Sequence, residues 1–134
     1  MSDSKISKIL WNIPAYVAAL ILIQTLYFKF TGQPESVYIF ETLGMEPYGR
    51  IGSGIGELIA AVLLIIPSTA LFGALMSLGV ISGALFFHLT SLGIVVQDDG
   101  GTLFVLATVV FLCSISVVFR EKTKLASLIS SLRK

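Results

Sequence analysis

The chain has 134 residues, of which 55% are hydrophobic and 13% are charged. The charged share is about half of that in a typical soluble domain, and the apolar share is far too high for a disordered chain. The formal net charge of +1 does not supply the basic surface of a nucleic-acid-binding domain, so no nucleic-acid partner is expected. Length and composition together predict one small, all-α domain within a lipid bilayer.

Four apolar stretches are long enough to cross a membrane, because a hydrocarbon core about 30 Å thick needs roughly 20 helical residues. They cover residues 13–30, 47–66, 70–92 and 103–120. Backbone polar groups in lipid must be paired within their own segment, which favours helices over isolated strands. The sequence therefore predicts a single four-helix transmembrane bundle over residues 1–134, ending in an amphipathic tail at 121–134.

The connections contain residues that typically end or begin helices. Residues 67–69 (Pro-Ser-Thr) predict a tight hairpin with a proline stop and hydroxyl N-caps, and Thr102 is the N-cap candidate for the last span. In the longest connection, residues 34–43 predict a short helix that begins with proline and is ended by Gly44. We expect this helix to lie on the membrane surface or to fold over the mouth of the bundle.

Lysine and arginine are concentrated towards the two ends of the chain. The N-terminal tail carries Lys5 and Lys8, residues 120–134 carry five basic residues, and the hairpin at 67–69 carries none. The two other connections offer two basic residues against five acids. By the positive-inside rule both termini are predicted to be cytoplasmic. In a bacterium this describes a multi-pass protein of the inner membrane, with the short surface helix in its first periplasmic loop.

Several polar side chains lie within or at the ends of the predicted spans, where each ionisable group costs roughly 2.5–3.5 kcal/mol on insertion. Antiparallel packing places all of them in the outer half of the bilayer. They are Gln24, Tyr27, Lys29, Arg50, Glu57 and His88. We expect the Glu57 carboxyl to be paired with a neighbouring cation, protonated or wetted by a cavity. The group then forms either a polar pocket or an ion pair, with Lys29 or Arg50, that only fixes helix packing.

Small residues recur every four positions in two of the spans. Gly52, Gly56 and Ala60 form one such row, and Gly79 and Gly83 form another. This spacing lets helices approach closely in lipid. We interpret both rows as contacts inside the bundle, in preference to contacts that build a homo-oligomer.

The sequence supplies few groups for catalysis or metal binding. With a single cysteine, Cys113, the chain has no disulfide relay of its own, and one histidine cannot ligate a haem from two sides. No metal site is predicted, and no complete set of catalytic or redox-cofactor ligands is present. We therefore do not expect the chain to be an enzyme by itself.

A set of short motifs extends from residue 16 to residue 118. It consists of Lys29 closing the first span, Gly32 and Pro34 in the long loop, Gly56–Glu57 at the opening of the second span and His88 late in the third. With this set the chain resembles the DoxX-like family of small four-span bacterial membrane proteins. Family members often have a glycine three residues before the lysine, where this chain has Leu26, so it resembles a divergent branch.

The resemblance implies that Lys29, Glu57 and His88 are the recurrent polar positions of that family. Some of its members are small membrane subunits of quinol oxidases or of thiosulfate:quinone oxidoreductases. For this chain it implies an accessory or anchoring subunit of a membrane redox system, with a membrane or periplasmic redox protein as partner. In a quinone pocket, His88 and Glu57 would exchange protons with a quinone oxygen, and Lys29 would stabilise the anionic form.

Two other functions stay open. The chain could be a small-solute or proton-coupled transporter with Glu57 as its titrating group, although four helices are few for alternating access without oligomerisation. It could also be a purely structural membrane partner protein. The shape of the cavity distinguishes the three functions. A pocket in one half of the membrane favours the redox subunit, a path across both halves favours the transporter, and a dry ion pair favours the structural protein.

Overall fold

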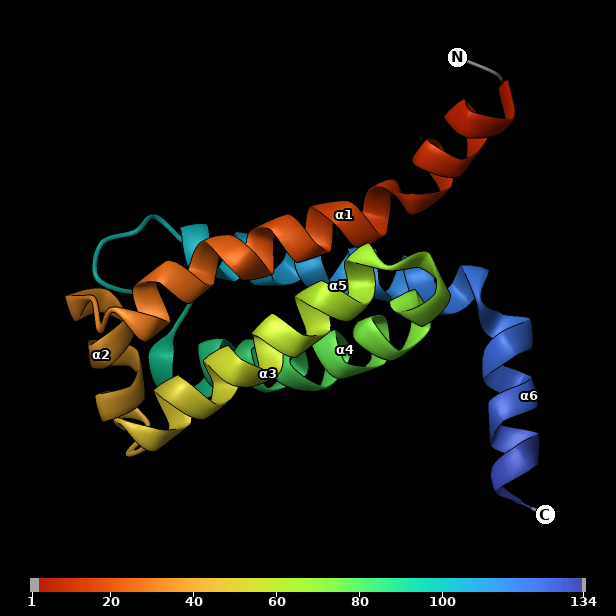
Figure 1. The fold of residues 1–134 in the computed structure, drawn as a ribbon. Helices are drawn as coiled ribbons and strands as arrows, with labels where there is room; N and C mark the ends of the chain where they lie inside the picture. Colours follow the sequence, from red (N-terminus) through yellow and green to blue (C-terminus); the bar gives the residue numbers. More distant parts are fainter. Residues whose placement is uncertain (1–2, 134) are drawn as a thin grey trace.

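The computed structural model describes residues 3–133, which form helices joined by short connections (Figure 1). Four helical stretches are long and apolar enough to cross a membrane. They are α1 (Asp3–Phe30), α3 (Tyr48–Ile65), the combined stretch η1 (Pro67–Thr69), α4 (Ala70–Phe87) and η2 (His88–Leu92), and α5 (Thr102–Arg120). Two further helices are α2 (Pro34–Thr42) and α6 (Lys122–Leu132). For residues 3–133, the predicted all-helical fold with four helices long and apolar enough to cross a membrane is confirmed.

Most helix boundaries follow the predicted ones, with two differences. The first helix begins at Asp3 and not at residue 13, and it continues through Pro14, so its N-terminal part extends beyond the other long helices (Figure 1). In the third stretch the α-helix ends at Phe87, and residues His88–Leu92 form a π-helical turn. Such turns widen a helix locally and often occur at functional sites.

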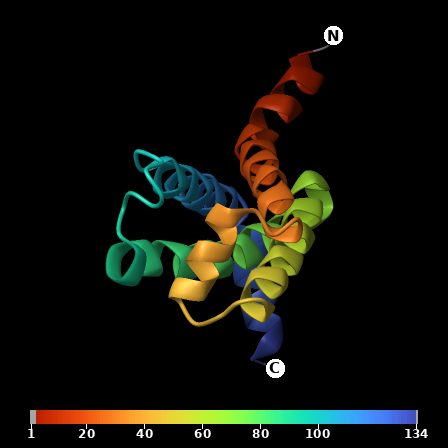
Figure 2. The same cartoon turned by 90° about the vertical axis from the view of Figure 1, so that its left-hand side faces the viewer.

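The four long helices pack so that each of them contacts two of the others. α1 contacts α3 and α5, α3 contacts α4, and α4 contacts α5. α2 contacts α1, α3 and η2, and Figure 2 shows it lying across one end of the long helices. We call this end the α2 end, and we call the opposite end, where η1 joins α3 to α4, the hairpin end.

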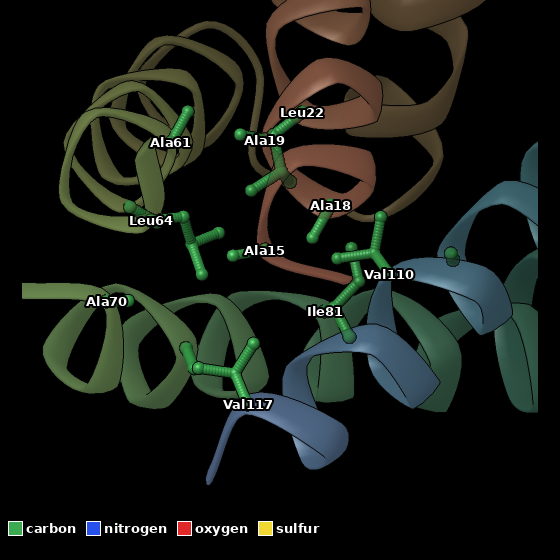
Figure 3. Packing of buried hydrophobic residues seen from close by; sticks show 13 residues of the cluster. Ala15, Ala18, Ala19, Leu22, Ala61, Leu64, Ala70, Ile81, Val110 and Val117 are labelled. Carbon is green, nitrogen blue, oxygen red and sulfur yellow. The ribbon is translucent and has the colours of Figure 1, made fainter. Parts of the chain in front are cut away.

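The hairpin half of the molecule is tightly packed by short side chains. Ala15 and Ala19 of α1 face Ala61 and Leu64 of α3, Ala18 points towards Val110 and Ile81, and the four alanines and Leu64 are at most 1% exposed (Figure 3). Short side chains let helix backbones approach closely, which stabilises helix pairs in lipid through van der Waals contact. The space between the helices is therefore filled in this half.

At a glycine outside the two predicted rows, two helix backbones approach each other closely. A Cβ atom added to Gly73 would lie 2.6 Å from the backbone nitrogen of Leu64 and 2.9 Å from the carbonyl oxygen of Ala60. By contrast, a Cβ atom at Gly52, Gly79 or Gly83 would meet nothing within 4 Å. The prediction that those three glycines mark close contacts is wrong, because a spacing of four defines a helix face but not the direction in which it points.

The predicted hydroxyl caps are also wrong. Neither η1 nor α4 has a side-chain cap, and the hydroxyl of Thr69 donates to the carbonyl oxygen of Leu63 at 2.9 Å. The hydroxyl of Thr102 likewise donates to the carbonyl oxygen of Asp99 at 2.7 Å. Because a hydroxyl can donate as well as accept, an exposed carbonyl of the preceding turn competes with the free N–H groups of the helix.

Candidate functional site

A cavity of about 530 Å³ lies at the α2 end of the molecule. Side chains from α1, α2, α3, α4, η2 and α5 line it, and most of them are aliphatic or aromatic. The contributing parts of α1, α4 and α5 are the halves next to α2. A volume of this size with apolar walls and a few polar groups is typical of a site for a small organic ligand. We call it the α2-end cavity.

An ion pair between two helices forms part of the cavity wall. The ammonium of Lys29, in the last turn of α1, forms a salt bridge with the carboxylate of Glu57 on α3. The hydroxyl of Thr25 lies 3.1 Å from the second carboxylate oxygen, and also 2.8 Å from the carbonyl oxygen of Leu22. Thr25 and Lys29 are four residues apart, so they share the helix face that meets Glu57. Both charged groups line the cavity, so the pair is not sealed within the core.

Burial explains why this pair forms. Glu57 is 3% exposed, and an ionised carboxylate in such surroundings is costly unless it is paired and hydrogen-bonded. The side chain of Lys29 is 17% exposed, which leaves the ammonium in contact with the cavity. An ammonium has three N–H donors, so a donor remains for a ligand beside the one that Glu57 takes.

Arg50 does not share this site. Its guanidinium binds the carboxylate of Glu46 one turn earlier, with Nε at 2.9 and 3.0 Å from the two oxygens. It also donates to the backbone carbonyl of Lys29, one of the carbonyls that the end of α1 leaves free. Arg50 therefore does not line the cavity; its side chain joins α3 to the end of α1.

Of the two other α1 residues predicted for the pocket, only one reaches it. Gln24 lines the cavity, with an exposed side chain. Tyr27 is 62% exposed, packs edge-on against Phe28 and does not line the cavity. Residues two apart on a helix point in nearly opposite directions, so Tyr27 cannot share the face of Thr25 and Lys29.

His88 provides the second polar group of the cavity wall. Its side chain is buried at the start of η2, and Nδ1 lies 2.9 Å from the carbonyl oxygen of Gly93. A carbonyl oxygen only accepts, so Nδ1 carries the hydrogen and Nε2 is the nitrogen available to a ligand. The ring also packs edge-on against Phe104 at 5.8 Å between centroids. These two contacts hold the imidazole in one orientation.

His88 lies apart from the Lys29–Glu57 ion pair in the cavity wall. Within residues 3–133, no hydrogen bond or ion pair joins His88 to Lys29 or to Glu57, although all three side chains line the same cavity. No three His, Cys, Asp or Glu side chains gather closely enough in that range to hold a metal ion. The arrangement therefore offers hydrogen bonds to two separate points on an otherwise apolar ligand.

Sequence reasoning missed several polar residues of the cavity. They are Thr25 on α1, Glu35 and Ser36 on α2, Ser53 on α3, Asp99 before α5 and Thr102 at its start. For two of these residues, the sequence contains a pattern that indicates their place in the site. Thr25 precedes Lys29 by one helical turn, and Asp99 stands before two glycines and an apolar run, where an acid typically caps a helix.

Asp99 accepts hydrogen bonds from backbone N–H groups at the start of α5 and in the loop before it. One carboxylate oxygen lies 2.8 Å from the nitrogen of Gly101 and 3.0 Å from that of Val96, and the other lies 3.1 Å from that of Leu103. Partial burial by itself raises the pKa of Asp99. The three N–H donors and the nearby charge of His88 outweigh that effect, so the pKa lies below its ordinary value.

We expect Asp99→Asn to lower the free energy of unfolding by about 1–3 kcal/mol near pH 7, because an amide NH₂ would face a backbone N–H group and leave that donor without an acceptor. A carboxyl with a lowered pKa in the fold stabilises it above the ordinary pKa, and this stability is lost as the pH falls through the lowered value. Thermal unfolding in detergent at neutral and acid pH measures both effects. Asp98→Asn is the control, since Asp98 is exposed; equal losses in the two variants would contradict the cap.

Comparison of the chain with models of protein families, with curated proteins and with solved structures found no match. The resemblance to the DoxX-like family therefore stays a prediction.

Proposed function

We propose that the chain is an accessory or anchoring subunit of a membrane redox system and binds a quinone in the α2-end cavity. In this proposal it is a DoxX-like four-helix bundle of the bacterial inner membrane. Both termini are cytoplasmic, so the α2 end lies in the outer half of the bilayer and α2 in the first periplasmic loop. The concentration of basic residues at the hairpin end supports this orientation.

The observation that carries the proposal is a mostly apolar cavity whose wall holds the ammonium of Lys29 and the imidazole of His88 at separate places. A quinone has a flat, mostly apolar ring with two carbonyl oxygens, and it supplies two-electron redox chemistry when bound. The apolar side chains around Phe28, Phe40 and Phe87 fit the ring. The ammonium of Lys29 fits one oxygen as a hydrogen-bond donor. Because Nδ1 of His88 already donates to Gly93, Nε2 fits the other oxygen as a donor in the imidazolium form, in which both ring nitrogens carry a hydrogen.

In this proposal each polar residue of the site has its own role. Lys29 stabilises negative charge on one oxygen, because a fixed cation in a poorly hydrated cavity acts strongly on developing charge. Glu57 and Thr25 hold that ammonium in place. His88 holds or releases a proton at Nε2 while Nδ1 stays bound to Gly93. The sequence has no haem or cluster ligand set, so electrons would pass to or from a partner protein.

The same cavity disfavours the two other functions. A transporter needs a path through both halves of the molecule, whereas the hairpin half is filled by buried residues such as Ala15, Ala61 and Ala74. A purely structural ion pair would be sealed in the core. Here Lys29 and Glu57 form part of a cavity wall, which supports a ligand-binding role.

Infrared difference spectroscopy of the full chain in detergent, with and without a water-soluble 1,4-benzoquinone, tests the proposal. We expect the carbonyl bands of the quinone to shift on binding, and Glu57→Gln to weaken binding about tenfold, because Lys29 loses its charged partner. Glu41→Gln is the matched control, since Glu41 is exposed and does not line the cavity. Absence of a band shift, or equal binding by both variants, would overturn the proposal.

A further inference from the structure

A second hollow lies at the hairpin end, the opposite end of the long helices from the α2-end cavity. It has a volume of about 660 Å³ and is formed mainly by α6, with Phe72 of α4 on its other side. The residues that matter are Phe72, Arg120, Glu121, Lys124, Ser127 and Ser131. We call this hollow the α6 groove. Figure 1 shows that α6 turns away from the long helices and runs across their direction.

α6 is amphipathic. Its apolar side chains Ile129 and Leu132 are 45% and 80% exposed, whereas Thr123, Ser127 and Ser131 follow one another at intervals of four residues and line the groove. Residues at this spacing share one helix face. An amphipathic helix that crosses the direction of the membrane spans and carries lysines is typical of a helix lying in the headgroup region.

Arg120 is a cation that the protein compensates only in part. Its side chain is 8% exposed, and its guanidinium lies 5.5 Å from the centre of the Trp11 ring. The guanidinium also donates a hydrogen bond to the backbone carbonyl oxygen of Trp11. Its Nε is a buried donor without a hydrogen-bond partner among residues 3–133. The carboxylate of Glu121 lies 3.6 Å from this nitrogen, too far for a hydrogen bond. A buried donor left without an acceptor is unfavourable, which favours an additional anion beside Arg120.

Lys124 adds a second cation to the groove. Its ammonium donates to the carbonyl oxygen of Ser68 at 2.7 Å and lies 5.7 Å over the ring of Phe72. One of its three N–H donors is used in this way, so the others remain for a ligand. The groove thus combines two cations, a row of hydroxyl groups and an apolar wall, with Glu121 as its one acid.

We propose that the α6 groove binds the headgroup of an anionic phospholipid. Arg120 and Lys124 bind the phosphate oxygens, the hydroxyls of Ser127 and Ser131 bind the polar part of the headgroup, and an acyl chain lies along Phe72. The apolar wall favours a lipid over a free phosphate ion. This inference depends on the membrane placement proposed above but not on the quinone site, which lies at the other end of the molecule.

Electron spin resonance on the full chain in phosphatidylcholine vesicles tests this site, with spin-labelled phosphatidylglycerol as the probe. The measured quantity is the selectivity for this lipid over spin-labelled phosphatidylcholine. We expect Lys124→Gln to lower the selectivity about fivefold, in line with the effect of one cation near a membrane surface. Glu121→Gln should raise the selectivity by a similar factor, because it removes the acid that opposes the phosphate.

The matched control is Lys122→Gln. Lys122 lies on the same helix, over the ring of Phe119, and does not line the groove. We expect it to change the selectivity by less than about half of the Lys124 effect. Equal losses for the two lysine variants would mean diffuse surface charge and would overturn the site. Complete displacement of the labelled lipid by millimolar inorganic phosphate at constant ionic strength would show a free-phosphate site and would also overturn the proposal.

Discussion

Lys29→Met is expected to lower the free energy of unfolding by about 3–5 kcal/mol, the usual cost of removing one partner from a buried ion pair. The variant leaves the carboxylate of Glu57, which is 3% exposed, with only the hydroxyl of Thr25 beside it. Reversible unfolding in mixed micelles measures the loss. Lys5→Met is the control on the same helix, because Lys5 is exposed. A loss below about 1 kcal/mol would show that the pair does not stabilise the fold.

The double variant Lys29→Met, Glu57→Met separates stability from ligand binding. Replacing both partners of a buried pair by apolar residues of similar volume is often neutral for stability. We therefore expect the double variant to recover most of the stability lost in Lys29→Met. It should nevertheless fail to shift the carbonyl bands of the quinone, because the cavity then lacks the ammonium donor. Recovery of both properties would assign the pair to helix packing alone.

Gly73→Ala is expected to lower the free energy of unfolding by about 2–3 kcal/mol, a cost typical of overpacking. The new methyl group would lie 2.6 Å from a backbone nitrogen and 2.9 Å from a backbone oxygen of α3. Backbone atoms cannot rotate away as a side chain does, so α3 and α4 would have to separate. Thermal unfolding in detergent measures the effect.

Gly79→Ala on the same helix is the matched control for Gly73→Ala. A methyl group there meets nothing within 4 Å, and alanine is the better helix former by about 1 kcal/mol. We expect this variant to be as stable as the original chain or more stable. If both glycine variants lost the same stability, the close contact of α3 with α4 at Gly73 would be contradicted.

The sequence by itself determined the helices and their approximate ends. The apolar runs, the prolines at 34 and 67 and the glycine at 44 act on the chain locally, so the predicted spans and the short helix Pro34–Thr42 agree with the structure. The cost of burying ionisable groups in lipid also singled out Lys29, Glu57 and His88. All three line the α2-end cavity. These properties depend on composition and on spacing along one helix.

Only the tertiary structure decided which way each helix face points. Rotation about the helix axis pairs Glu57 with Lys29 and not with Arg50, and it leaves Tyr27 on the outside of α1. The same rotation places Gly73, and none of Gly52, Gly79 and Gly83, against the backbone of a neighbouring helix. A burial cost requires that a charge have a partner, but which partner it meets depends on how four helices pack together, and no single segment encodes that packing.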